Sequence, residues 1–348
     1  MVPAPAVLFA NPTAQSGRAA DWIKRARALL DESGIEHRFV ATEPQGRTIE
    51  LVSRAIDEDG ARLLVYMGGD GTFAEVAKGI LGAGHASEAT LGMLPTGTAN
   101  DQGKSFGLSA GPGALADNVK VIAAGAAIRV DVGRIQLLDA ADQVFHTDLF
   151  FDSASIGFGA SALATRNRDR EIVSGIPVLR ELYRDHLVYA GAVVRRFLES
   201  YVTDVKFDLD VEVWPGGGGP PRQLRYQSLL DVIIKNTHVF GGEWVLDPDA
   251  LADDGLFELV PIAGRRDLTS KLLATYRHSP IDEADLRAIG IEHSEPVPGE
   301  RFELTILAPG ATEPPAAQID GEELPRSDRF RIDVLARCLR LIVPRDRR

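Results

Sequence analysis

The sequence is poor in the residues that build thiolate and imidazole sites. It has a single cysteine in 348 residues, Cys338, and seven scattered histidines without the spacing of metal ligands. Cys338 has no partner for a disulfide, which fits a reducing compartment. It lies in the apolar run CLRLIV, so we expect a small core residue rather than a nucleophile. Disulfide scaffolds and metal-thiolate sites are therefore not expected.

Basic charge is also scarce, because 38 Lys and Arg oppose 50 Asp and Glu for a formal net charge of -12. A nucleic-acid partner would need a basic stripe to displace counterions from phosphates, so none is expected. No apolar run approaches the length of a membrane span. The start, MVPAPAVLFANP, is a poor signal peptide and a good first strand. We expect a cytoplasmic protein that meets a membrane only transiently, at the membrane surface.

The length favours two domains, and the hydrophobic pattern changes near residue 131. In residues 1–130, short apolar runs alternate with amphipathic segments at 21–30, 48–56 and 73–81, and with one that ends near Ala124. Strands that alternate with helices predict a mostly parallel sheet with helices on both faces. The first domain is therefore predicted to be α/β.

Residues 131–348 have the period of strands. VKFDLDVEVW alternates apolar and charged residues, and GGGGPP after it is typical of a hairpin connection. Further strands are predicted at LLDVIIK, LFELVPI, RFELTILA, RFRIDVLA and CLRLIV, which makes this domain all-β and sandwich-like. Residues 166–201 are mixed basic and apolar, and we expect helices or an excursion from the sheet there.

The stretch YMGGDGTFAEV places a carboxylate, Asp70, in a glycine turn between a predicted strand and a predicted helix. Such a turn offers free backbone N–H groups and the positive end of a helix dipole, which together bind anions. The alternative is an ordinary tight turn, with glycine for positive φ and Asp70 or Thr72 as the helix N-cap. Asp70 beside a polyphosphate would be repulsive without a cation, so the turn indicates a nucleotide bound with Mg²⁺.

A second loop, LPTGTANDQGKSFGL, follows the next predicted strand. It approaches a Walker A loop but has one residue too many between its glycines. GKSFG satisfies the G-x-S-x-G pattern of hydrolases, but TGTANDQ precedes Ser105 where a strand is required. Both generic matches are interpreted as accidental.

Several stretches in order resemble the diacylglycerol kinase catalytic-domain family of lipid kinases. They are NPTAQSG, GGDGTFAEV, LPTGTAND, SIGFGA at 155–160, NTHVFGGEWVLDPDALADDGLF at 236–257 and IDGEEL at 319–324. The resemblance implies an α/β ATP-binding domain over residues 1–130, of the fold that NAD kinases share, and a β-sandwich over 131–348. It also implies transfer of phosphate from ATP, with Mg²⁺, to the hydroxyl of a lipid alcohol.

Carried over by motif, the resemblance implies three groups of site residues. The implied ATP site comprises Asn11, Pro12, Thr13, Ser16, Gly17, Thr42, Gly68, Gly69, Asp70, Gly71, Thr72, Glu75, Thr98 and Asn100. The implied catalytic residues are Asp70 and Asp101, which organise Mg²⁺ and water, and Asp320 and Glu322, one of which is the base. A structural Mg²⁺ is implied at Asp254 with the backbone carbonyls of Leu251 and Leu256.

The sequence departs from the family at three places. The first loop is longer than usual, Ala74 stands where asparagine is common, and Gln102 replaces an apolar residue. The first two departures concern nucleotide affinity, and the third concerns the loop that faces the acceptor.

Alternatives remain open at this stage. NAD kinases share the GGDGT turn, but they carry an Asn-Glu pair, and no Asn-Glu dipeptide occurs in this sequence. A non-catalytic nucleotide- or lipid-binding module would not need Asp320 or Glu322. Diacylglycerol, a ceramide or sphingoid base, and a polyprenol all remain as acceptors, and the oligomeric state is open, with a homodimer among the alternatives. Residues 165–197 gather arginines and apolar side chains, which suggests either a membrane-facing gate or a helix pair over the sandwich.

Overall fold

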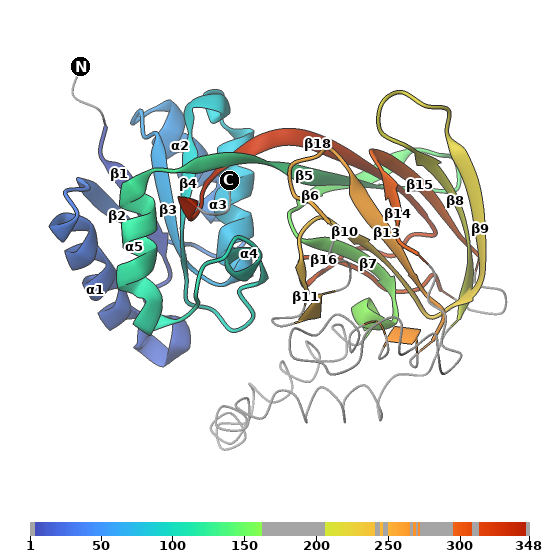
Figure 1. Ribbon diagram of the computed structural model, residues 1–348, viewed down its shortest axis with the longest axis horizontal. Helices are drawn as coiled ribbons and strands as arrows, with labels where there is room; N and C mark the ends of the chain where they lie inside the picture. Colours follow the sequence, from blue (N-terminus) through green and yellow to red (C-terminus); the bar gives the residue numbers. More distant parts are fainter. Residues whose placement is uncertain are drawn as a thin grey trace.

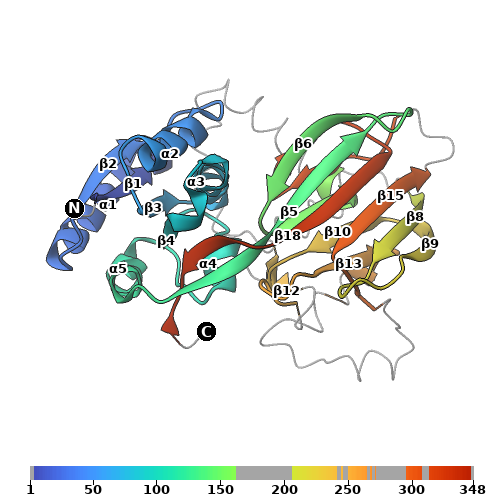
Figure 2. The same ribbon diagram turned by 90° about the horizontal axis from the view of Figure 1, so that it is seen from above.

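The computed structural model describes residues 4–161, 206–240, 244–245, 250–264, 267–268, 271, 295–307 and 313–345. Two parts lie beside each other, and two long strands join them (Figures 1 and 2). The segments 166–201 and 165–197, on which helices and a membrane contact were predicted, lie outside the described residues. Among the helices that are described, none is long and apolar enough to cross a membrane.

The first part is the predicted α/β layer structure. Its parallel strands lie in the order β2-β1-β3-β4 and are β1 (Ala6–Ala10), β2 (His37–Ala41), β3 (Leu63–Gly68) and β4 (Thr90–Pro95). Its longer helices are α1 (Ala19–Glu32), α2 (Arg47–Asp57), α3 (Asp70–Gly82) and α5 (Leu115–Ala124). Its shorter helical segments are η1 (Ala14–Gly17), η2 (Ala86–Glu88), α4 (Asp101–Ser105) and η3 (Pro112–Ala114). The apolar faces of α2 and α3 pack on one side of the sheet, and those of α1 and α5 on the other.

The second part is a sandwich of two sheets. One is six-stranded, in the order β14-β13-β10-β7-β16-β17, with β7 (Ser153–Gly157), β10 (Asp231–Lys235), β13 (Phe257–Ile262), β14 (Val297–Gly299), β16 (Ala317–Ile319) and β17 (Glu322–Glu323). Opposite it lie β5 (Ala127–Leu138), β6 (Val144–Phe150), β8 (Phe207–Trp214), β9 (Arg222–Leu229), β15 (Arg301–Leu307) and β18 (Arg329–Ile342). A short pair, β11 (Val239–Phe240) and β12 (Trp244–Val245), is separate.

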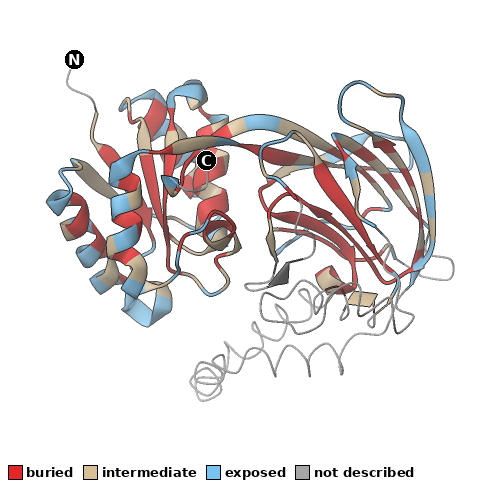
Figure 3. Ribbon diagram, viewed as in Figure 1, coloured by how far each residue is buried: buried red, intermediate tan, exposed pale blue. Residues whose placement is uncertain are grey.

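Residues of both sheets form the core of the sandwich (Figure 3). In β8 the alternation predicted from the sequence is observed, because Phe207, Leu209, Val211 and Val213 are buried and the charged residues between them are partly exposed. The predicted fold class, an α/β domain and a β-sandwich, is confirmed.

The two long strands tie the parts together. β5 and β18 pair antiparallel from Arg329 opposite Leu138 to Ile342 opposite Ala127, and Leu341 also pairs with Leu91 of β4. RFRIDVLA and CLRLIV are therefore one strand and not the two predicted, with an irregularity between Leu335 and Leu339 where Arg337 adopts a φ of 52°. The C-terminal strand thus returns to the sheet of the first part, and the boundary at residue 131 stays a prediction.

Candidate functional site

The two glycine loops follow neighbouring parallel strands, β3 and β4, and therefore meet at one edge of the sheet. Asp70 joins them, because its carboxylate accepts the backbone N–H groups of Asn100 at 2.8 Å and of Gln102 at 3.2 Å. The Asn100 side chain closes its own loop through both the N–H and the carbonyl of Gly97. The carboxylate in the glycine turn is thus a bridge to the start of α4.

The structure differs in two details from the ordinary tight turn that the sequence left as an alternative to an anion site. The residue that precedes α3 is Gly69, and no side chain caps this helix, so neither Asp70 nor Thr72 is its N-cap. Gly68, Gly69 and Gly71 do not have positive φ angles. Two of the glycines in the two loops are required on steric grounds: a Cβ on Gly97 would lie 2.3 Å from the Gly69 Cα, and one on Gly68 would lie 2.5 Å from the Thr72 Oγ1, whereas one on Gly71 would meet nothing within 4 Å. Close approach of the two loops explains Gly97, and close approach of the Thr72 side chain explains Gly68.

The first loop, after β1, has an unusual backbone. Gln15, Ser16 and Gly17 are three successive residues with positive φ, of 51°, 62° and 88°. Asn11 organises the entry, because its Oδ1 accepts both the N–H and the hydroxyl of Thr13. Thr42 lies at the end of the adjacent strand β2 and donates its N–H to Ala10. The predicted ATP-site residues of the first loop and Thr42 thus lie on neighbouring strand ends, and Thr98 of the second loop is exposed beside Gly97.

The IDGEEL turn connects β16 to β17 at the edge of the six-stranded sheet. Asp320 has a φ of 47°, and its carboxylate accepts the N–H groups of Phe151, Asp152 and Ser153 at 2.7, 2.8 and 3.0 Å. The pKa of Asp320 is nevertheless raised to about 7, because removal from water and the nearby Asp152 charge outweigh these hydrogen bonds. Asp320 is therefore bound to backbone, whereas Glu322 is exposed.

Charges of the second part act on carboxyl groups of the first. The pKa of Glu75 in α3 is raised, mainly by burial and further by the charge of Glu322, while a hydrogen bond with Thr48 and the charge of Lys78 oppose the shift. Burial and the Asp152 charge also raise the pKa of Asp70, against the two backbone N–H groups it accepts.

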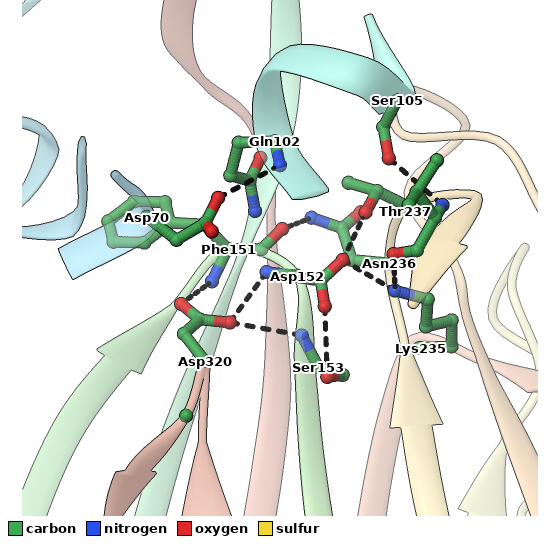
Figure 4. A network of polar contacts seen from close by, with 12 residues as sticks. Asp70, Gln102, Ser105, Phe151, Asp152, Ser153, Lys235, Asn236, Thr237 and Asp320 are labelled. Atoms are coloured by element: carbon green, nitrogen blue, oxygen red, sulfur yellow. Dashed lines mark hydrogen bonds and ion pairs between the residues drawn. The ribbon is translucent and has the colours of Figure 1, made fainter. Parts of the chain in front are cut away.

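Two segments in which the sequence analysis named no site residue hold the Asp320 turn in place (Figure 4). Residues 151–153 supply the N–H groups to Asp320, and residues 235–237 hold 151–153 from the other side. A signal was present for one member: Lys235 is a charged residue at the end of LLDVIIK, a run that is apolar except for Asp231 and Lys235. Such a residue, when buried, requires a partner.

The predicted metal loop packs against Asp131. The Asp131 carboxylate accepts the N–H groups of Gly255 and Arg337, and the Arg337 guanidinium donates to the Asp253 carbonyl. Burial raises the pKa of Asp131, and the charges of Asp254 and Asp253 raise it further.

The surplus of carboxylates in this loop suits a hard cation such as Mg²⁺. No group of three or more His, Cys, Asp or Glu residues placed for a metal occurs in the described part of the chain. The site at Leu251, Asp254 and Leu256 remains a prediction.

Ser105 and Cys338, neither of which was expected to be a nucleophile, have structural roles. Ser105 ends the helix α4 and does not follow a strand, and its Oγ accepts the N–H of Val239 from the second part. Cys338 is half-buried against the core, and burial raises the pKa of its thiol to about 11. A thiol with a raised pKa is a poor nucleophile.

The comparisons with known proteins agree with this geometry. Residues 5–135 match the family model described as the diacylglycerol kinase catalytic domain. The chain is 28% identical over 253 residues to a probable lipid kinase YegS-like of Pseudomonas aeruginosa, covering 72% of this chain and 70% of the relative. It is 27% identical over 342 residues to the probable lipid kinase YegS of Escherichia fergusonii, covering 95% of each.

Solved structures share the fold. The crystal structure of a diacylglycerol kinase from Bacillus anthracis superposes with a TM-score of 0.66 at 16% identity, over 99% of both chains. Yeast NADH kinase superposes with a TM-score of 0.51 at 12% identity, over 98% of this chain and 84% of the other. The predicted resemblance and the predicted enzyme class, a phosphotransferase of the diacylglycerol kinase type, are confirmed: residues 5–135 match the diacylglycerol kinase catalytic domain, and the relatives are named as lipid kinases.

Proposed function

We propose that the protein is a lipid kinase that transfers the γ-phosphoryl group of ATP, bound with Mg²⁺, to the hydroxyl of diacylglycerol or a related lipid alcohol. The observation that carries the proposal is the contact between the helices that follow the two glycine turns and the second part. Lys78 of α3 pairs with Asp148 of β6, the Ser105 Oγ of α4 accepts the Val239 N–H, and the charge of Glu322 acts on Glu75 of α3. A nucleotide site on one part then faces a candidate base on the other. Phosphoryl transfer requires such an arrangement, since it depends on alignment, charge neutralisation and a proton acceptor.

The loops after β1, β3 and β4 are proposed to bind the phosphates. Gln15, Ser16 and Gly17 of the first loop have positive φ, and α3 begins at the adjacent strand end, where the N–H groups of a first helical turn can bind an anion. The Asp70 carboxylate accepts the N–H groups of Asn100 and Gln102, and its remaining lone pairs can take a further ligand. Mg²⁺ would be held through Asp70 and Asp101, and when bound it neutralises charge on the transferred group.

Glu322 is proposed as the base. Asp320 is held by three N–H groups, whereas Glu322 is exposed on the short strand β17. An exposed carboxylate can reach a hydroxyl brought by a second substrate. Asp320 would then fix the turn from which Glu322 extends.

A phosphorylation assay with a panel of acceptors tests the proposal. Diacylglycerol, ceramide, a sphingoid base, a polyprenol and NAD are each supplied in mixed micelles or buffer with labelled ATP, with and without Mg²⁺. We expect Mg²⁺-dependent labelling of at least one lipid and none of NAD. Labelling of NAD alone would replace the proposal with the NAD kinase alternative, and ATP binding without any labelled product would favour a non-catalytic module.

A further inference from the structure

Lys235 is a fully buried lysine at the end of β10. Its side chain is 0% exposed, and its Nζ lies 2.5 Å from the Asp152 Oδ1 and 2.7 Å from the Val239 carbonyl oxygen. Burying an ammonium group costs several kcal/mol unless it is paired and hydrogen-bonded. Because apolar residues of similar volume often stabilise a core better than a buried ion pair does, stability alone is a weak reason for this pair.

Asp152 connects Lys235 to the DGE turn. Its carboxylate accepts from Lys235, from the Thr237 hydroxyl and from the Ser153 hydroxyl, and it is nearly buried. Its backbone N–H donates to the Asp320 Oδ1 at 2.8 Å. Asp152 therefore links the two residues: Lys235 holds its side chain, and its backbone N–H holds Asp320 (Figure 4).

Asn236 fastens the same segment at a second point. Its Nδ2 donates to the carbonyls of Phe151 at 2.7 Å and of Asp131 at 3.0 Å, and its backbone N–H donates to the Asp152 carbonyl at 2.9 Å. Residues 151–153 are thus held on one side by β10 and its extension. On the other side they present three N–H groups to Asp320.

The turn that contains Asp320 has an uncommon backbone conformation. Asp320 and Gly321 both have positive φ, of 47° and 83°, and the first of them is not glycine. Such conformations cost free energy and persist only where surrounding contacts impose them. The three N–H groups of 151–153 are contacts of that kind.

We propose that Lys235 and Asp152 are positioning residues for the phosphoryl transfer, and that they act through the Asp320 turn on Glu322. This inference rests on the proposed function and deepens it. Lys235 does not touch a substrate, since it is fully buried. Displacement of a reacting group by about 1 Å can cost on the order of a hundredfold in rate, so a rigid anchor behind the base has a direct kinetic effect.

The test is a kinetic double-mutant cycle between Lys235 and Glu322 on the lipid that wild-type enzyme phosphorylates best. We expect Lys235→Met to lower kcat about tenfold or more and to change the KM for ATP much less, because Lys235 bonds to Asp152 and to the Val239 carbonyl, neither of which belongs to the implied ATP site. In the Glu322→Gln background the same substitution should cost almost nothing further, since its route to the chemistry is already removed.

A matched control is Lys271→Met, which removes another nearly buried lysine, paired with Asp267 at 3.0 Å. It should leave kcat near the wild-type value. If Lys235→Met does not fold, Asp152→Asn serves in its place, because it keeps the backbone N–H to Asp320 and removes the charge that pairs with Lys235. The hydrogen bonds with Thr237 and Ser153, and the influence of the Asp152 charge on the pKa of Asp320, change with it.

A wild-type kcat in folded Lys235→Met overturns the inference, and so does a loss of equal size with and without Glu322. Wild-type enzyme that phosphorylates no lipid overturns the proposed function itself, and the inference with it.

Discussion

Lys78 of α3 and Asp148 of β6 form an ion pair between the two parts of the molecule. Nζ and Oδ1 lie 2.7 Å apart, and the side chains are only 15% and 28% exposed. Lys78 lies three residues after Glu75 in α3 and opposes the rise of the Glu75 pKa that burial and the charge of Glu322 cause. The pair therefore helps to fix the separation of the proposed nucleotide site from the proposed base.

We expect a favourable coupling between these two residues. Lys78→Met and Asp148→Asn should each destabilise the protein, and the double variant should lose less than the sum, with a coupling of about 1 kcal/mol. Asparagine is chosen because its Oδ1 can still accept the Leu149 N–H that Asp148 accepts. Urea unfolding of the four proteins measures the cycle. Additive losses would show that the ion pair contributes nothing to the contact.

The contact between the glycine loops predicts that Gly97 cannot be alanine. A Cβ on Gly97 would lie 2.3 Å from the Gly69 Cα and 3.0 Å from its nitrogen, so backbone would have to move. We expect Gly97→Ala to cost about 1–3 kcal/mol of stability and to weaken ATP binding.

Gly113→Ala is the control for Gly97→Ala, since a Cβ there meets nothing within 4 Å and Gly113 lies in η3, outside the implied ATP site. Thermal melting and calorimetric ATP titration compare the two variants. Equal behaviour of the two would contradict the steric explanation of the glycines.

Periodicity made much of the fold predictable. The helical spacing of Phe73, Val76 and Ile80 follows from one buried face, and these residues do pack on the sheet. The alternation in β8 likewise follows from a half-buried strand. Local patterns of this kind record which face of an element is buried.

Local patterns do not predict contacts between segments that are far apart in the sequence. Lys235 and Asp152 are separated by 83 residues, and the sequence around either residue does not indicate that the two form a pair. The return of β18 to β4 through Leu341 depends on the same long-range pairing. Asp70 could be located in a turn from the sequence, but its partners, Asn100 and Gln102, follow only from the adjacency of β3 and β4.

The DGE turn predicts different outcomes for its two acids. Glu322→Gln should lower turnover roughly a hundredfold or more, the usual size of a general-base contribution, and leave the melting temperature and ATP binding nearly unchanged. Asp320→Asn should lower both turnover and melting temperature, because an amide nitrogen would then face one of the N–H donors at 151–153. Steady-state kinetics and thermal melting of both variants test this division. Full activity in Glu322→Gln would remove it from the role of base.

Titration of Asp231 should make the free energy of unfolding depend on pH. This buried carboxyl accepts the Ser155 hydroxyl at 3.1 Å and the Gly159 N–H at 2.6 Å, and burial raises its pKa from 3.8 to about 7. Between those two values the unfolded chain releases a proton that the folded protein keeps. The free energy of unfolding should therefore fall as pH rises through this window, by up to about 1.4 kcal/mol per pH unit, and the contribution should level off above pH 7.

Asp231→Asn isolates this effect, because asparagine can keep both hydrogen bonds after rotation of its amide and cannot titrate. Asp320, whose pKa is also raised to about 7, contributes with the same sign and is unchanged in the variant. Urea unfolding at pH 5 and pH 8 should show that the variant loses less stability on alkalinisation than wild type, by an amount on the order of 2 kcal/mol. Asp117→Asn, at a side chain that is 78% exposed, is the control and should behave like wild type. An identical loss in wild type and Asp231→Asn would mean that the Asp231 carboxyl is already ionised in the folded protein at pH 5.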